Sequence, residues 1–99
     1  MSESKSISEI LAERGKRYGS FMGNAHISQS LKHQMAAQDN WVTLQDDQRE
    51  ALEMIAHKIA RILNGDPNYV DNWVDIAGYA KLVSDRLTAE ESALQNPSF

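Results

Sequence analysis

Apolar residues recur at helical spacing in four separate stretches of the chain, and this pattern predicts an all-α fold. The clearest stretch runs from about Leu44 to Leu63, where apolar positions repeat every three or four residues. The apolar arc comprises Leu52, Ile55, Ala56, Ile59, Ile62 and Leu63. The opposite face comprises Glu50, Met54, His57 and Arg61, and Lys58 lies at the boundary. This helix should bury the first face and leave the second in water.

The segment Asn-Gly-Asp-Pro at 64–67 predicts the end of that helix, because proline cannot continue it and glycine accepts backbone angles closed to other residues. A further helix is expected from about Val70 to Leu87. Its apolar arc comprises Val70, Trp73, Ile76, Ala77, Ala80, Val83 and Leu87. A short connection between two long helices predicts an antiparallel C-terminal hairpin.

Two shorter helices are expected before the hairpin. Ser6 and Glu9 have the spacing of a capping box, which predicts a helix over about 7–17. After a glycine-containing break, Asn24 is placed to cap a second helix over about 25–38, with one apolar stripe made by Ile27, Leu31 and Met35. Thr43 is placed to cap the third helix, and Trp41 and Trp73 are expected to anchor the core.

The whole pattern predicts one domain over residues 1–88, followed by a flexible tail over 89–99. No apolar run approaches the ~20 residues of a membrane span, so a cytoplasmic protein is expected. Cysteine is absent, which excludes disulfides and thiolate chemistry. The formal net charge of -4 disfavours binding to duplex DNA but leaves room for a small anion held by local cations.

Polar residues converge on one flank of the expected hairpin. With the turn centred between residues 66 and 67, facing positions have numbers that sum to roughly 133. Lys58 should then lie near Asp75, and Arg61 near Asp71 and Asn72, with Tyr79 one turn beyond Asp75. Two interpretations fit: salt bridges at the rim of the core, or cations that bind phosphate while the carboxylates orient them or hold a metal.

Three weaker signals accompany this cluster. Lys16, Arg17 and Tyr18 lead into a glycine-containing loop that could cradle an anion and stack on a base, although basic residues also complement a helix end. His57 could contact a ligand or lie in solvent. Glu50 and Glu53 could share a magnesium ion or form a solvated face.

Residues 13–19, 53–62 and 71–80 together resemble a group of small phage and prophage proteins. The order of a Tyr-Gly element, a Lys-x-x-Arg helix and an Asp-x-x-x-Asp helix ending in Gly-Tyr resembles the phage nucleotide-modification-associated domains. More distantly, the chain is similar to MazG-type all-α nucleoside triphosphate pyrophosphohydrolases. That resemblance implies a four-helix MazG-like domain, a homo-oligomer, and nucleotide binding between helices with magnesium held by carboxylates.

The expected function is therefore that of a phage protein in the host cytoplasm that binds a nucleotide or a nucleotide-derived signal, such as a cyclic one used in host defence. Because cations stand where the similar hydrolases carry acidic ligands, direct anion binding is favoured over metal-assisted hydrolysis. The alternatives are a magnesium-dependent pyrophosphohydrolase that uses Glu50, Glu53 and Asp75, and a small adaptor that binds a host protein.

Overall fold

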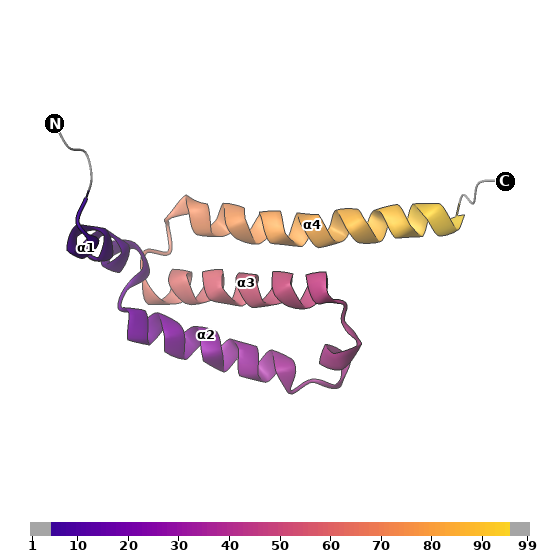
Figure 1. The fold of residues 1–99 in the computed structure, drawn as a ribbon, viewed down its shortest axis with the longest axis horizontal. Helices are drawn as coiled ribbons and strands as arrows, with labels where there is room; N and C mark the ends of the chain where they lie inside the picture. Colours follow the sequence, from indigo (N-terminus) through magenta and orange to yellow (C-terminus); the bar gives the residue numbers. More distant parts are fainter. Residues whose placement is uncertain (1–4, 96–99) are drawn as a thin grey trace.

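The computed structural model describes residues 5–95, and α-helices contain most of them (Figure 1). The elements are α1 (Ile7–Tyr18), α2 (Phe21–Ala36), a short 3-10 helix η1 (Asp39–Thr43), α3 (Asp46–Asn64) and α4 (Val70–Gln95). No strand occurs among the described residues. The all-α prediction with a C-terminal hairpin is confirmed, since α3 and α4 pack against each other.

The starts of the helices differ in part from the predicted ones. The Ser6 capping box is present, with Glu9 N–H donating to the Ser6 hydroxyl at 3.1 Å. The Asn24 cap is wrong: Ser20 caps α2 by accepting from Gly23 N–H, so Asn24 lies inside the helix and is buried. The Thr43 cap is also wrong, because Thr43 belongs to η1 and Gln45 is the N-cap residue of α3.

Helices α2, α3 and α4 lie side by side in one layer, and α1 crosses one end of it (Figure 1). The molecule measures 62 × 39 × 21 Å, so it is flat and elongated. Helix α3 is the middle element and packs on both α2 and α4. A helix with neighbours on two sides must bury two faces, and a prediction with one apolar arc misses the second.

The burial along α3 shows this difference. Its buried residues are Ala51, Ala56, Lys58 and Ala60. Leu52 and Leu63, which the pattern placed in the core, are 40% and 67% exposed. The face predicted to be wet packs toward α2 instead, and its Met54, His57 and Arg61 are half-buried.

The inward face of α4 is also rotated from the predicted one. Asn72 is 1% exposed and Asp75 reaches Lys58 on α3, whereas Val70 and Trp73 are exposed. Trp73 is therefore not a core anchor; its indole N–H donates to the Pro67 carbonyl at 2.9 Å. Trp41 is half-buried.

An ion pair fixes α4 against the start of α3. The Arg86 guanidinium donates to both carboxylate oxygens of Asp47, at 2.8 and 2.7 Å, and this holds the pKa of Asp47 below its usual value. Beyond this pair α4 continues past α3 to Gln95 (Figure 1). The expected flexible tail over 89–99 thus begins as helix, and residues 96–99 lie outside the described part of the chain. No helix within that part combines the length and apolar character needed to cross a membrane.

Two turns meet in backbone contact where α1 crosses the layer, a place called here the turn crossing: residues 17–20 and 64–66. Asp66 N–H donates to the Arg17 carbonyl at 2.7 Å. The Asn64 side-chain amide donates to the carbonyls of Tyr18 and Ser20, both at 2.8 Å. Only glycine fits at two positions here, since a Cβ on Gly19 or Gly65 would lie about 2 Å from backbone oxygen of the other turn.

The turn crossing predicts a strong effect of one methyl group. Gly65→Ala should destabilise the fold by about 1–3 kcal/mol, because the added Cβ would lie 2.1 Å from the Arg17 carbonyl oxygen. Gly15→Ala is the matched control: nothing lies within 4 Å of its Cβ position, so better helix propensity should stabilise the protein by about 0.5–1 kcal/mol. Urea unfolding of both variants measures the difference, and equal midpoints would contradict the account.

Candidate functional site

A pocket of about 380 Å³ opens beside the turn crossing, between α1, the start of α2 and the C-terminal half of α3. We call it the Tyr18 pocket. Its lining joins cationic, aromatic and amide side chains and contains no carboxylate: Leu11, Arg14, Gly15, Tyr18, Gly19, Ser20, Phe21, Asn24, His57 and Arg61. In a chain of net charge -4, this is a local surplus of positive charge.

Arg61 is the main cation of the pocket. Its guanidinium carbon lies 4.1 Å from the centre of the Tyr18 ring, a cation-π contact that holds the planar group in place. The Arg61 Nε is buried and has no hydrogen-bond partner within the described residues. A buried donor without a partner is costly, so an acceptor that bound this guanidinium from the pocket would stabilise it.

Asn24 supplies the complementary polar atom. It is 6% exposed, lines the same pocket, and its side-chain oxygen has no partner among the described residues. Close by, Ser20 and Phe21 bring the N-terminus of α2 to the pocket wall, where the first N–H groups of a helix have no carbonyl within the helix. The pocket therefore offers a hydrogen-bond acceptor next to a set of donors.

His57 adds an imidazole between the cations. Partial burial lowers its pKa, and the nearby charges of Arg61, Lys58 and Lys32 lower it further. At neutral pH His57 is therefore an uncharged group that can donate or accept a hydrogen bond. An anion bound in the pocket would oppose the effect of the nearby cations, raise the pKa of His57 and favour its protonated form.

The predicted flank cluster is divided in the structure, and one part is a salt bridge on the hairpin. Lys58 Nζ lies 3.0 Å from Asp75 Oδ2, as the register predicted. Lys58 is buried and Asp75 half-exposed, so the pair ties α3 to α4. Tyr79 lies with Asp75 along a shallow hollow on α4, away from the Tyr18 pocket lining.

A second part is a chain of contacts beside the turn crossing. Arg17 Nη1 donates to the Tyr69 hydroxyl at 2.9 Å, and that hydroxyl donates to Asp71 at 2.8 Å. This bond to Asp71 raises the pKa of Tyr69. Tyr69 also packs edge-on against Tyr18, with ring centres 6.1 Å apart, while Lys16 stays exposed on α1.

The sequence interpretation thus named three residues of the pocket, Tyr18, His57 and Arg61, and missed others. Arg14 lies one helical turn before Tyr18, a spacing that places both on one face of α1. Asn24 was missed because it was assigned to a helix cap. The expected contact of Arg61 with Asp71 is replaced by the contacts with Tyr18 and the chain through Tyr69.

The two glutamates do not join a larger acidic group. Glu50 is exposed, and Glu53 lines an open hollow with Lys32 and His33. Across residues 5–95, no three His, Asp or Glu side chains come together in a way that could hold a metal ion. Magnesium at Glu50 and Glu53 stays a prediction.

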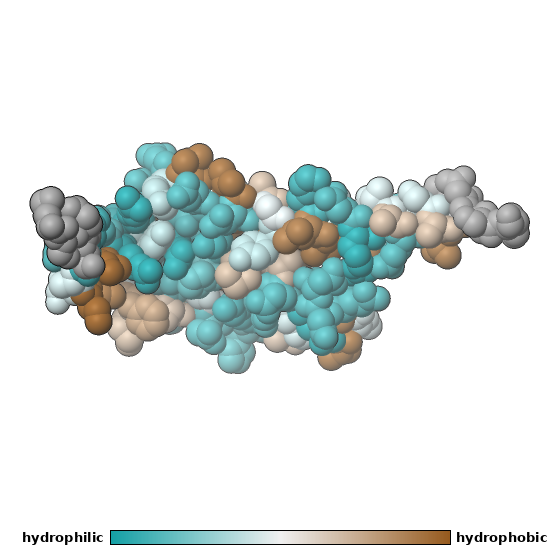
Figure 2. Space-filling view, turned by 45° about the horizontal axis from the view of Figure 1, so that its top comes forward, coloured by the Kyte–Doolittle hydropathy of each residue, from teal (hydrophilic) through white to brown (hydrophobic). Residues whose placement is uncertain are grey.

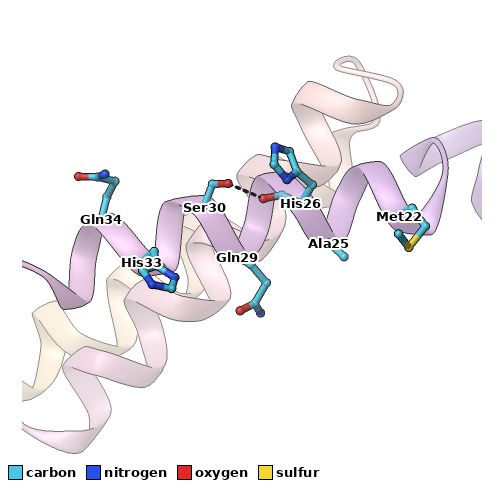
Figure 3. Close-up of a pocket in the computed structure, with 7 residues that line it drawn as sticks. All are labelled: Met22, Ala25, His26, Gln29, Ser30, His33 and Gln34. Carbon is cyan, nitrogen blue, oxygen red and sulfur yellow. Dashed lines mark hydrogen bonds between the residues drawn. The ribbon is translucent and has the colours of Figure 1, made fainter.

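Another hollow, of about 610 Å³, follows the outward side of α2 (Figure 3). Figure 3 shows its side chains spread along the helix, with Ser30 donating to the His26 carbonyl. The residues are neutral amides, a serine, two histidines, Met22 and Ala25. This open surface lacks the cations and the unpaired buried atoms of the Tyr18 pocket.

A family model described as "Domain of unknown function (DUF6378)" matches residues 3–87, and so covers the Tyr18 pocket, α3 and most of α4. The chain belongs to the DUF6378 family. No curated protein and no solved structure matches it. The phage origin and the MazG-like relation of this DUF6378 chain stay predictions.

His57 makes the stability of the fold depend on pH. Its pKa is lower in the folded than in the unfolded chain, so the unfolded state takes up the proton first as pH falls. This contribution to stability is fully present above the unfolded pKa of about 6.5 and is lost as pH falls from there toward the folded pKa. Urea unfolding between pH 7.5 and 6.0 should show declining stability, with a smaller decline in His57→Gln. Equal slopes in the two proteins would contradict the lowered pKa.

Proposed function

We propose that this protein binds a nucleotide or a nucleotide-derived phosphate compound in the Tyr18 pocket, without hydrolysing it. The observation that carries the proposal is the lining itself: two arginines and an imidazole, no carboxylate, and unpaired buried atoms on Arg61 and Asn24. A volume of about 380 Å³ is within the range of small-molecule sites.

The phosphate would lie against Arg61, Arg14 and the N-terminus of α2. A planar guanidinium contacts two phosphate oxygens at once, and helix N–H groups favour a negative charge. Arg61 is already stacked on Tyr18, so little side-chain freedom is lost when it binds.

The nucleoside would lie toward Phe21 and Asn24. Phe21 is 81% exposed at the pocket wall, and a base stacked on its ring would cover it. The Asn24 oxygen can accept a hydrogen bond from a ribose hydroxyl or a base N–H, which inorganic phosphate cannot offer in the same place. The pocket therefore favours a nucleotide over a simple anion.

Binding alone, rather than pyrophosphohydrolysis, is proposed because the acidic residues are engaged elsewhere or isolated. Asp75 is paired with Lys58, and Glu50 is exposed and does not line the pocket. Metal-assisted hydrolysis needs carboxylates around a shared ion. In a phage setting, such a binder would sequester a nucleotide signal of the host or hold a nucleotide for modification.

Arg61 should dominate the affinity. Arg61→Ala removes a charge-assisted contact worth about 1.5–3 kcal/mol, so calorimetry with mono-, di-, tri- and cyclic nucleotides should show a roughly 10- to 100-fold loss for the best ligand. Lys81→Ala is the control, since Lys81 pairs with Asp85 on α4. The proposal fails if the wild type binds no nucleotide tighter than about 1 mM, or if both variants bind equally.

Asn24 should separate nucleotide from phosphate recognition. Asn24→Ala should weaken the best nucleotide by roughly 5- to 10-fold, the value of a neutral hydrogen bond, and leave inorganic phosphate binding unchanged. Arg61→Ala should weaken both ligands. Asn68→Ala, at an exposed asparagine in the α3–α4 turn, is the matched control. Equal losses for nucleotide and phosphate in Asn24→Ala would show that Asn24 does not contact the nucleoside.

A further inference from the structure

Helix α4 carries an exposed stripe with the spacing of a coiled-coil seam. Its members follow one another at alternating steps of three and four residues, all are exposed, and none is charged: Val70, Trp73, Ala77, Ala80, Ser84 and Leu87. We call them the α4 stripe. Side chains at this spacing form one straight seam along a helix, which is the pattern that two packed helices share.

The fold leaves this stripe uncovered while it buries little elsewhere. Within residues 5–95 the buried apolar side chains are Ala51, Ala56 and Ala60. The radius of gyration is 17.9 Å, against about 13 Å for a compact domain of this length. Figure 2 shows hydrophobic patches at separate places along the molecule, set among hydrophilic surface.

The side chains of the α4 stripe are complementary in size to those of a second, antiparallel copy of the stripe. When two copies run antiparallel about a two-fold axis between residues 78 and 79, facing positions have numbers that sum to 157. Ala77 then faces Ala80 of the second copy, which lets the backbones approach closely at the axis. Trp73 faces Ser84 of the second copy, so each large side chain meets a small one.

A hollow beside the stripe receives the large side chain. It has a volume of about 260 Å³ and lies between Ala80 and Val83 of α4 and Ala51, Leu52 and Ile55 of α3. In the same two-fold arrangement, Trp73 of each copy lies beside the hollow of the other copy, because it faces Ser84 there. The exposed half of the indole and the exposed side of Leu52 would then be covered together.

The area and the charge also fit a second copy. From residue 70 to residue 87 the helix is about 26 Å long, and two adjacent helices are about 20 Å wide. The face formed by α3 and α4 thus offers about 500 Å² for contact in each copy, or about 1,000 Å² in total. This area reaches the size of a specific interface. A two-fold axis makes the same surface patch of both copies meet, so a charged patch would face its own charge. The α4 stripe carries no charge, and this repulsion is therefore avoided.

We propose that this protein forms a two-fold symmetric homodimer in which the α4 stripes of two copies pack antiparallel, each Trp73 lying in the hollow next to Ala80 of the other. This interface is independent of the Tyr18 pocket, because the two share no residue.

Sedimentation equilibrium tests the dimer with two matched substitutions on α4. The wild type should be a dimer at about 100 μM, and Ala77→Glu should weaken association roughly 100-fold or more by placing two carboxylates near the axis. Leu82→Glu changes an apolar residue that is 68% exposed outside the stripe, and should stay dimeric. Far-UV circular dichroism establishes that each variant is helical. A monomeric wild type, or equal dissociation of both variants, overturns the proposal.

Cysteine cross-linking tests the direction of the helices, since the chain has no cysteine of its own. A mixture of Ala77→Cys chains and Ala80→Cys chains, each with a single cysteine, should give a covalent heterodimer on oxidation, because the two positions face each other across the axis. Ser84→Cys alone should not, because its copies lie about 16 Å apart along an antiparallel pair, too far for a disulfide. Efficient cross-linking through Ser84→Cys would indicate a parallel pair and overturn the proposed arrangement.

Discussion

The backbone contact between the two turns is the constraint on which the rest of this structure depends. Asp66 N–H reaches the Arg17 carbonyl, and Asn64 binds two further carbonyls of the α1–α2 turn. The backbones of residues more than forty positions apart are thereby held in direct contact. No side chain separates Gly65 from the backbone of the α1–α2 turn. This contact sets where α1 crosses the helical layer, and it brings Tyr18 of α1 over Arg61 of α3.

The same constraint explains why the polar residues divide as they do. Lys58 lies one turn before Arg61 on α3, yet it pairs with Asp75 across the hairpin, whereas Arg61 turns toward α1. Helix α1 is placed to stack an aromatic ring on the guanidinium only because the turns cross. The result is a pocket without carboxylates in an acidic chain, since the nearby Asp71 is bound by Tyr69 and Asp75 by Lys58.

The helices and the hairpin could be predicted from the sequence because periodicity and the Asn-Gly-Asp-Pro turn report on local structure. The short turn also fixed the register, so Lys58 and Asp75 were paired correctly. The faces could not be predicted, since a single arc assumes one neighbour and α3 has two. Asn24 shows the same limit: a polar residue at the edge of an apolar stripe indicates a cap locally, but tertiary packing buries it in α2. Arg14 and Asn24 enter the site only through the crossing of α1, which no local pattern encodes.

Small side chains in the middle of the layer link the pocket to the exposed stripe. Ala51, Ala56 and Ala60 are the buried apolar residues of α3, and their size lets α2 and α4 approach it closely on both sides. Close packing on alanine covers little apolar area, so larger residues such as Leu63 and Trp73 are left on the outside. Polar contacts also hold the single flat layer together, among them Arg86 with Asp47 and Asn64 with the α1–α2 turn. Among the apolar side chains excluded from this thin core, those of the α4 stripe are the ones that the proposed second copy would cover, and that contact would stabilise an elongated chain with a small core of its own.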